Sequence, residues 1–286
     1  MSILKISAYG ASNVGKRRQN NEDNYYLDGQ YVDSLNDTST QVSDQTEIIV
    51  SVCDGMGGEA AGEVASQIAV ETVNKNYQNL LKENISDSAI EKCINEANAL
   101  ICDEIVKNKK RLGCTFTLFG CLNDLATISN IGDSRVYRFH QNCLEQISVD
   151  HTEAQRLVNA GVISAEDSMK IPEKHRLTQH LGIFPDEMIL QPYTVRLTAF
   201  PEDKYLLCSD GLTDMLSDNE INAIISNGTS LKDTVNQLIE KALEKGGKDN
   251  VTVVLCEITD GELEPVNDNN TSQLKSALKD FFKIKL

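Results

Sequence analysis

The chain reads IIVSVCDGMGG over residues 48–58. An apolar, strand-like run here delivers the carboxylate of Asp54 into a glycine-rich turn. The same arrangement recurs at three further aspartates that stand at the ends of apolar runs: Asp133, Asp210 and Asp249. The sequence therefore predicts four aspartates at strand ends.

These aspartates predict a metal site if the fold brings them together. Carboxylate and backbone carbonyl oxygens beside glycines suit magnesium or manganese. Zinc is disfavoured, because the four histidines are scattered and none neighbours the aspartates in the sequence. A single Asp-Gly pair is more often a turn. Four converging carboxylates would cost too much to bury without a cation.

Composition sets the class of protein. With 286 residues, 40% of them hydrophobic, we expect one domain with a sizeable core. A formal net charge of -16 argues against general binding to nucleic acid or anionic membranes. The eight cysteines show no Cys-x-x-Cys spacing and read as buried free thiols, which fits a reducing compartment. No signal peptide or spanning segment is recognisable, so we expect a cytoplasmic protein.

The distribution of strand and helix patterns indicates an α+β fold. Two long helical patterns follow the glycine turn, the first through Val64 to Leu81 and the second through Ile90 to Ile105. A capping box at Ser217-Glu220 predicts a helix to about Ser226, and a further helix is expected over 231–245. Strands are predicted at 3–9, 24–27, 114–121, 125–130, 135–139, 195–198, 205–208 and 251–258. We expect a polar loop over 28–46 and a small flap within 150–186.

The chemistry must proceed without an organic nucleophile. Residues 55–60 match a loose dinucleotide-binding pattern, but Asp54 would face the pyrophosphate and a second helix follows the first. There is no Gly-x-Ser-x-Gly elbow, so water is the expected attacker. Asp54 is a candidate bridge between two divalent ions that activate this water. Arg18 is a candidate phosphate clamp, since a guanidinium matches phosphate oxygens.

These motifs together resemble those of the metal-dependent protein phosphatases, the PPM or type 2C family, in its bacterial branch. The resemblance runs from about Ile6 to Ile258. It rests on GKRRQNNEDN at 15–24, VCDGMGG at 52–58, and further matches at 113–115, 130–135, 150–152, 177–182, 209–211 and 247–252.

The resemblance implies a fold and a set of metal ligands. The fold is a sandwich of two antiparallel sheets flanked by pairs of helices, with a binuclear manganese or magnesium site at one end. Asp54 bridges both ions, Asp210 and Asp249 hold the first, and Gly55 contributes its carbonyl. Arg18 binds the phosphate. Glu22 and Asp23 match positions that contact the second ion directly or through water. Asp133, together with Asp210, matches a weaker site for a third ion.

The implied activity is that of a protein serine/threonine phosphatase in which a metal-bridging hydroxide attacks the phosphate, opposing a bacterial Ser/Thr kinase. The alternative is a catalytically weak phosphoprotein-binding regulator with the same fold. Met56 stands, as in bacterial members, where eukaryotic members carry a histidine proposed as general acid, and a thioether cannot donate a proton. The general acid is therefore unassigned.

Two parts of the chain are expected. Residues 1–259 form the catalytic domain, which we expect to be monomeric. Residues 260–286 form a polar linker and a short tail with Leu274 and Leu278 on one helical face and lysines elsewhere. One interpretation is a helix that packs on its own domain or frays in solution. The other is a helix that docks to a partner protein or to an anionic membrane surface.

Overall fold

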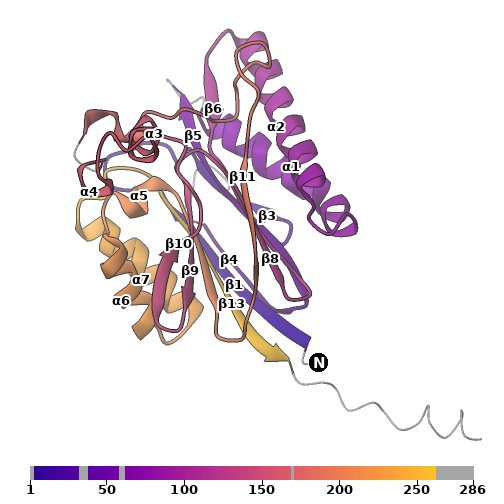
Figure 1. The fold of residues 1–286 in the computed structure, drawn as a ribbon, viewed down its shortest axis with the longest axis vertical. Helices are drawn as coiled ribbons and strands as arrows, with labels where there is room; N and C mark the ends of the chain where they lie inside the picture. The colour runs from indigo at the N-terminus through magenta and orange to yellow at the C-terminus, as the bar shows by residue number, and fades with distance from the viewer. Residues whose placement is uncertain (1–2, 32–37, 58–61, 169–170, 262–286) are drawn as a thin grey trace, which may run out of the picture.

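Backbone hydrogen bonds pair the strands into two antiparallel sheets. The sheets pack face to face through apolar side chains at alternate positions along the strands (Figure 1). The computed structural model describes residues 3–31, 38–57, 62–168 and 171–261. Helices cover the outer face of each sheet, so the molecule has four layers. The predicted α+β sandwich flanked by helix pairs is confirmed.

The first sheet has the strand order β10-β9-β12-β13-β1-β4. Its long central pair is β1 and β13, which run antiparallel in register from Ile3 opposite Gly261 to Asn13 opposite Val251. The strand bounds are Ile3–Asn13 for β1, Thr38–Gln45 for β4, Arg135–His140 for β9, Cys143–Gln146 for β10, Lys204–Cys208 for β12 and Val251–Gly261 for β13.

The second sheet has the order β11-β8-β7-β5-β2-β3, and the short strand β6 also pairs with β5. Strand β5 is central and carries the motif that ends in Asp54. The strand bounds are Asp23–Leu27 for β2, Gln30–Tyr31 for β3, Glu47–Gly57 for β5, Leu112–Cys114 for β6, Phe116–Leu122 for β7, Leu125–Ile131 for β8 and Tyr193–Thr198 for β11.

The core between the sheets is formed by side chains from both inner faces. Phe119 of β7 stacks on Tyr205 of β12 with ring centroids 4.5 Å apart, and both rings are buried. Val50, Val52 and Val254 fill the space around them. This packing fixes the two sheets relative to each other, and with them the strand ends that carry the acidic residues.

Two pairs of helices complete the sandwich. Helices α1 (Gly62–Lys82) and α2 (Asp87–Asn108) pack on the second sheet, and α6 (Asp218–Asn227) and α7 (Leu231–Glu244) pack on the first. The predicted capping box at Ser217 and Glu220 is present at the start of α6. Helix α5 (Asp210–Thr213) is a single turn after β12.

The predicted flap contains three short helical pieces between β10 and β11. These are α3 (Glu153–Asn159), α4 (Ala165–Ser168) and the 3₁₀ turn η1 (Pro172–His175). The backbone amide of Thr178 donates to the carbonyl of His151, which ties the end of the flap back to its start. Ion pairs of His175 with Asp210 and Asp214 place η1 beside α5.

Two details of the sequence interpretation were wrong. The segment 28–46, expected to be a loop, contains β3 and the eight-residue edge strand β4. Strand β4 pairs with β1 and buries only Thr40 and Val42, so its apolar signal is too weak to stand out from polar surroundings. Among the cysteines, all of which are free thiols, Cys143 is exposed and the other seven are buried.

Residues 262–286 lie outside the described part of the chain, so the predictions for the C-terminal tail and for a boundary near residue 259 stay predictions. Strand β13 itself runs on to Gly261. No helix in the described residues is long and apolar enough to cross a membrane.

Candidate metal centre

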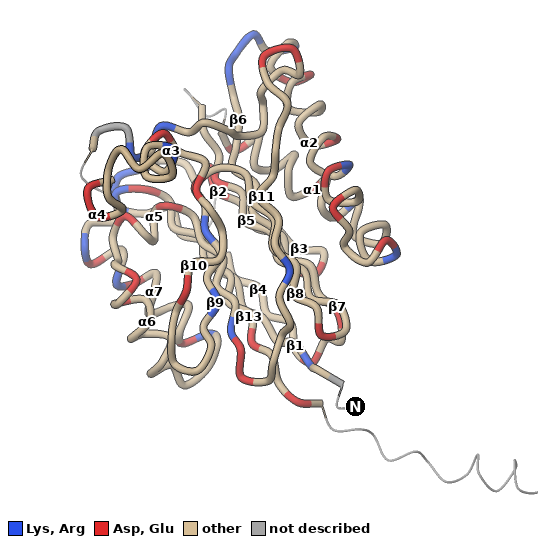
Figure 2. The backbone as a smooth tube through the Cα atoms, in the orientation of Figure 1, with Lys and Arg blue, Asp and Glu red and all other residues tan. Residues whose placement is uncertain are grey.

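An acidic cavity of about 580 Å³ opens at one end of the sandwich. Red segments lie beside β2 and α5 at this end (Figure 2). The cavity is lined by residues from both sheets, from the flap and from the loops between them: Arg18, Glu22, Asp54, Gly55, Met56, Gly57, Thr115, Asp133, His175, Leu177, His180, Asp210, Asp214 and Asp249.

Asp54 is held by sheet hydrogen bonding near the end of β5. Its partner across the sheet is Asp23 of β2. The backbone amide of Asp54 donates to Oγ1 of Thr115 over 2.8 Å, and the amide of Thr115 donates back to the carbonyl of Asp54 over 2.9 Å. These backbone hydrogen bonds therefore fix the position of the Asp54 main chain, from which the carboxylate extends.

Gly55 is required by a close approach of three backbones. Its amide donates to the carbonyl of Glu22 over 3.1 Å. A Cβ atom at position 55 would lie 2.2 Å from the carbonyl oxygen of Gly62 and 2.4 Å from that of Glu22. Any side chain would thus push apart β5, the start of β2 and the start of α1.

Asp23 lies behind the cavity and does not line it. Its carboxylate is buried, and Oδ2 accepts hydrogen bonds of 2.7 Å from the hydroxyls of Ser209 and Thr252. Burial raises the pKa of Asp23 to about 6 in spite of these two donors. Glu22, the neighbouring acidic residue, does line the cavity, so the two positions differ in access to a bound ion.

Asn250 joins the loop that carries Arg18 to the strand end that carries Asp249. Its amide group donates to the carbonyls of Val14 and Asn20, and its Oδ1 accepts from the backbone amide of Glu22 over 2.8 Å. Three hydrogen bonds to one side chain thus hold the segment of residues 14–22 beside the site.

Arg18 reaches across the rim of the cavity to Asp249. Its Nη2 lies 2.6 Å from Oδ2 of Asp249, and the two side chains are 49% and 36% exposed. A charge-assisted hydrogen bond of this length between half-exposed groups can be exchanged for one to a competing anion. The guanidinium therefore lies where an entering phosphate could take it over.

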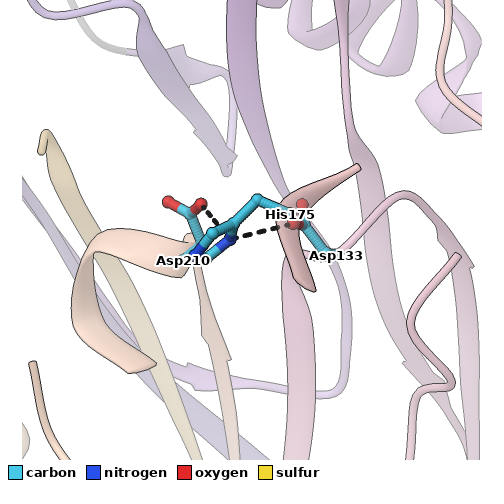
Figure 3. A group of neighbouring side chains, drawn as sticks. All are labelled: Asp133, His175 and Asp210. Carbon is cyan, nitrogen blue, oxygen red and sulfur yellow. Dashed lines mark ion pairs between the residues drawn. The ribbon is translucent and has the colours of Figure 1, made fainter. Parts of the chain in front are cut away.

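Asp133, His175 and Asp210 converge on the flap side of the cavity (Figure 3). Nδ1 of His175 lies 3.8 Å from Oδ2 of Asp133 and 3.5 Å from Oδ2 of Asp210. Its Nε2 lies 3.1 Å from Oδ2 of Asp214. No histidine neighbours these aspartates in the sequence, but the fold brings His175 to them from more than thirty residues before α5.

The carboxylates raise one another's pKa. Burial, followed by repulsion from Asp23 and Asp210, raises the pKa of Asp54 well above its ordinary range. Burial and the charges of Asp133 and Asp249 raise the pKa of Asp210 to about 8. The neighbouring carboxylates of Asp133 and Asp214 raise the pKa of His175 to about 10. Such a cluster of hard oxygen ligands is stabilised by divalent cations, so the donor set fits the predicted metal site.

The predicted site residues therefore meet, with one of them set back. Those that share the cavity are Arg18, Glu22, Asp54, Gly55, Asp133, Asp210 and Asp249. Asp23 supports them from behind. The sequence interpretation missed His175, Asp214 and Asn250. Asn250 adjoins Asp249 in the sequence and could have been suspected, whereas nothing in the sequence marks His175.

A family model described as "Protein phosphatase 2C" matches residues 32–256, well over half of the chain. The chain belongs to the protein phosphatase 2C family. The family resemblance inferred from the motifs is thus confirmed, and it includes the strand of Asp54 and the positions of Asp133, His175, Asp210 and Asp249.

Named relatives in the family are bacterial phosphatases. The serine/threonine phosphatase stp of Listeria monocytogenes is 34% identical over 214 residues, which are 73% of this chain and 84% of the relative. Protein phosphatase PhpP of Streptococcus pneumoniae is 29% identical over 261 residues, which are 88% of this chain and 98% of the relative.

Solved structures share the fold. The serine/threonine phosphatase PstP of Mycobacterium tuberculosis is 30% identical, has a TM-score of 0.75, and matches 90% of this chain and 100% of its own. The structure of a PstP catalytic domain in complex with two manganese ions is 29% identical and has a TM-score of 0.72. The match covers 90% of this chain and 100% of that domain.

Proposed function

We propose that this phosphatase hydrolyses phosphoserine and phosphothreonine in proteins with water as the attacking group. Its activity as a metal-dependent protein serine/threonine phosphatase follows from its family and from bacterial relatives of that activity. The observation that carries the proposal is the convergence of Asp54, Asp210 and Asp249 with Arg18 in one cavity.

We assign the metal ligands from access and chemistry. Asp54 lies centrally and would contact both ions, with Asp210 and Asp249 on one side and Glu22 on the other, and the Gly55 carbonyl adds a further oxygen. Asp23 would act through water or by holding its neighbours, because it does not reach the cavity. Two bound ions would make water a strong enough nucleophile at neutral pH. An all-oxygen set favours manganese or magnesium.

Arg18 is assigned to the phosphate of the substrate. The cavity is lined by six carboxylates, so a phosphate dianion entering it needs a compensating cation. Arg18 stands at the rim and is paired only with Asp249 among the interactions described for its side chain. Release of Asp249 to a metal would free the guanidinium fork to bind two phosphate oxygens.

The reaction breaks the bond between phosphorus and the serine or threonine oxygen while a water oxygen bonds to phosphorus. Its products are inorganic phosphate and the free hydroxyl, so the leaving oxygen must gain a proton. Met56 lines the cavity but its thioether has no proton to give. We assign this protonation to water.

We propose a cytoplasmic, monomeric enzyme that opposes a Ser/Thr kinase and uses the linker and tail of residues 260–286 to dock to a partner or membrane surface. The free thiols support a reducing compartment. The alternative, a catalytically weak regulator, is disfavoured because Asp54, Asp210 and Asp249 are all present in the cavity.

Phosphate release from synthetic peptides tests this function. The purified protein with Mn²⁺ should release phosphate from phosphothreonine and phosphoserine peptides faster than from a phosphotyrosine peptide of matched sequence, and EDTA should stop the reaction. A protein that binds these phosphopeptides but releases no phosphate with either Mn²⁺ or Mg²⁺ would be the regulator instead.

A further inference from the structure

His175 stands between two carboxylates that we assign to metal binding, and it is absent from every motif in the sequence. We propose that its Nδ1 is a nitrogen ligand of the third cation site, together with Asp133 and Asp210, and that it makes this site favour transition-metal ions over Mg²⁺. The inference rests on the proposed function, which assigns the two aspartates to cations.

The distances suit a shared ion. Two ligand atoms bound to one ion at about 2.1 Å each lie at most roughly 4.2 Å apart. Nδ1 of His175 lies 3.8 Å from an oxygen of Asp133 and 3.5 Å from an oxygen of Asp210. All three ligand atoms lie within 4.8 Å of one another, so closure around an ion needs only a small inward movement. Figure 3 shows the imidazole between the two carboxylates.

The other ring nitrogen of His175 is held by a carboxylate. Nε2 lies 3.1 Å from Oδ2 of Asp214, and Oδ1 of Asp214 accepts a 3.0 Å hydrogen bond from Nζ of Lys174. Histidines that bind metals usually donate their second N–H to a carboxylate, which fixes the tautomer and the ring orientation. With Nε2 held by Asp214, Nδ1 of His175 faces the cation site, and it releases its proton when an ion takes its place between the carboxylates.

Space for a small occupant adjoins the same side chains. A cavity of about 30 Å³ is bordered by Asp133, Asp210, His175 and Asp214. This volume holds one water-sized body. Asp150 also borders it, but its carboxylate is paired with Arg135 over 2.7 Å, so its charge is already balanced. The carboxylates that remain for a cation are those beside His175.

The nitrogen ligand determines which ion the third site prefers. Mg²⁺ takes oxygen ligands and keeps several waters, whereas imidazole strengthens binding of transition-metal ions. The central site, built only from oxygen ligands, lacks this preference. Loss of His175 should therefore weaken the third ion and leave the two tight ions in place.

Mn²⁺ binding to the full-length protein tests the proposal. Metal-stripped protein is titrated with Mn²⁺, the free ion is measured by its EPR signal, and ¹⁴N coupling to bound Mn²⁺ is recorded by pulsed EPR. The wild type should show ¹⁴N coupling that appears with the third equivalent. His175→Ala should lose it and raise the Kd of the third ion about tenfold to a hundredfold. His180→Asn, a change at the other histidine that lines the cavity, should keep both the coupling and the Kd.

The contradicting results can be told apart. Two tight ions without ¹⁴N coupling at the third equivalent, or coupling lost in His180→Asn rather than His175→Ala, would overturn the inference and leave the proposed function standing. A wild type without tight Mn²⁺ would contradict the proposed function and this inference with it. Asp214→Asn, which keeps His175 itself, should raise the Kd of the third ion by a smaller factor. It replaces His175→Ala if that variant fails to fold, and an unchanged Kd there would also overturn the inference.

Discussion

The two sides of the cavity are built differently. The inner side, Asp54 with Asp23 behind it, stands on paired strands in the middle of a sheet, and both residues are held by hydrogen bonds. The outer side, Asp133, His175 and Asp214, stands on a loop, the turn η1 and the end of α5. A sheet holds ligands within tight limits, whereas loops and single turns can shift to accept or release an ion. We therefore expect tight ions on the inner side and an exchangeable one on the outer.

The electrostatics of the two sides differ in the same way. On the inner side, burial and the negative charges of other carboxylates raise the pKa of Asp54. On the outer side the cationic imidazole of His175 already faces Asp133 and Asp210 in the absence of any ion. The inner side thus has the stronger need for a divalent cation.

The largest expected effect comes from breaking the inner side. Asp54→Asn should lower kcat on a phosphothreonine peptide about 100-fold or more, because the carboxylate between the two ions is lost. Asp210→Asn and Asp249→Asn should do the same. Circular dichroism serves as the control for folding. A folded Asp54→Asn protein with near-normal kcat would show that the tight ions do not depend on this residue.

The next effect separates substrate binding from metal binding. Arg18→Ala should raise KM for a phosphopeptide about 30-fold, since a charge-assisted hydrogen bond contributes about 2 kcal/mol, and change kcat less. Arg18→Lys keeps the charge but not the planar fork and should fall between. Steady-state kinetics at saturating Mn²⁺ gives both constants. An unchanged KM in Arg18→Ala would remove Arg18 from the phosphate site.

A smaller effect is expected on the outer side. Asp133→Ala should lower kcat about tenfold while the two tight Mn²⁺ ions still bind. Isothermal titration calorimetry alongside kinetics measures both. Loss of all Mn²⁺ binding in this variant would place Asp133 in the central site and abolish the distinction between the two sides.

The smallest effect is on stability. The pKa of Asp210 is about 8 in the folded protein and about 4 when unfolded. The folded state therefore binds more protons between these values, and in EDTA the free energy of unfolding should fall as pH rises from about 4 to about 8. Asp210→Asn should flatten this trend and raise Tm at pH 8 by at least about 3 °C. A Tm that rose with pH in EDTA would contradict the raised pKa.

The comparison also explains how far the sequence alone could lead. Asp54 and Asp249 were predictable because a strand end, a glycine turn and an aspartate adjoin in the sequence. His175 was not, because its contacts depend on how the flap returns over α5. The set-back position of Asp23 was hidden as well, since Ser209 and Thr252 that bury it come from far along the chain. Strand β4 was missed because an edge strand has only one buried face.

Phosphate release from a phosphothreonine peptide, followed while Mn²⁺ is titrated into metal-stripped protein, tests the central claim that the carboxylates around Asp54 work by holding divalent ions. We predict no turnover in EDTA, and turnover that rises as the two tight sites fill and increases further with a weaker third equivalent. Full turnover in EDTA, before any Mn²⁺ is added, would contradict the account.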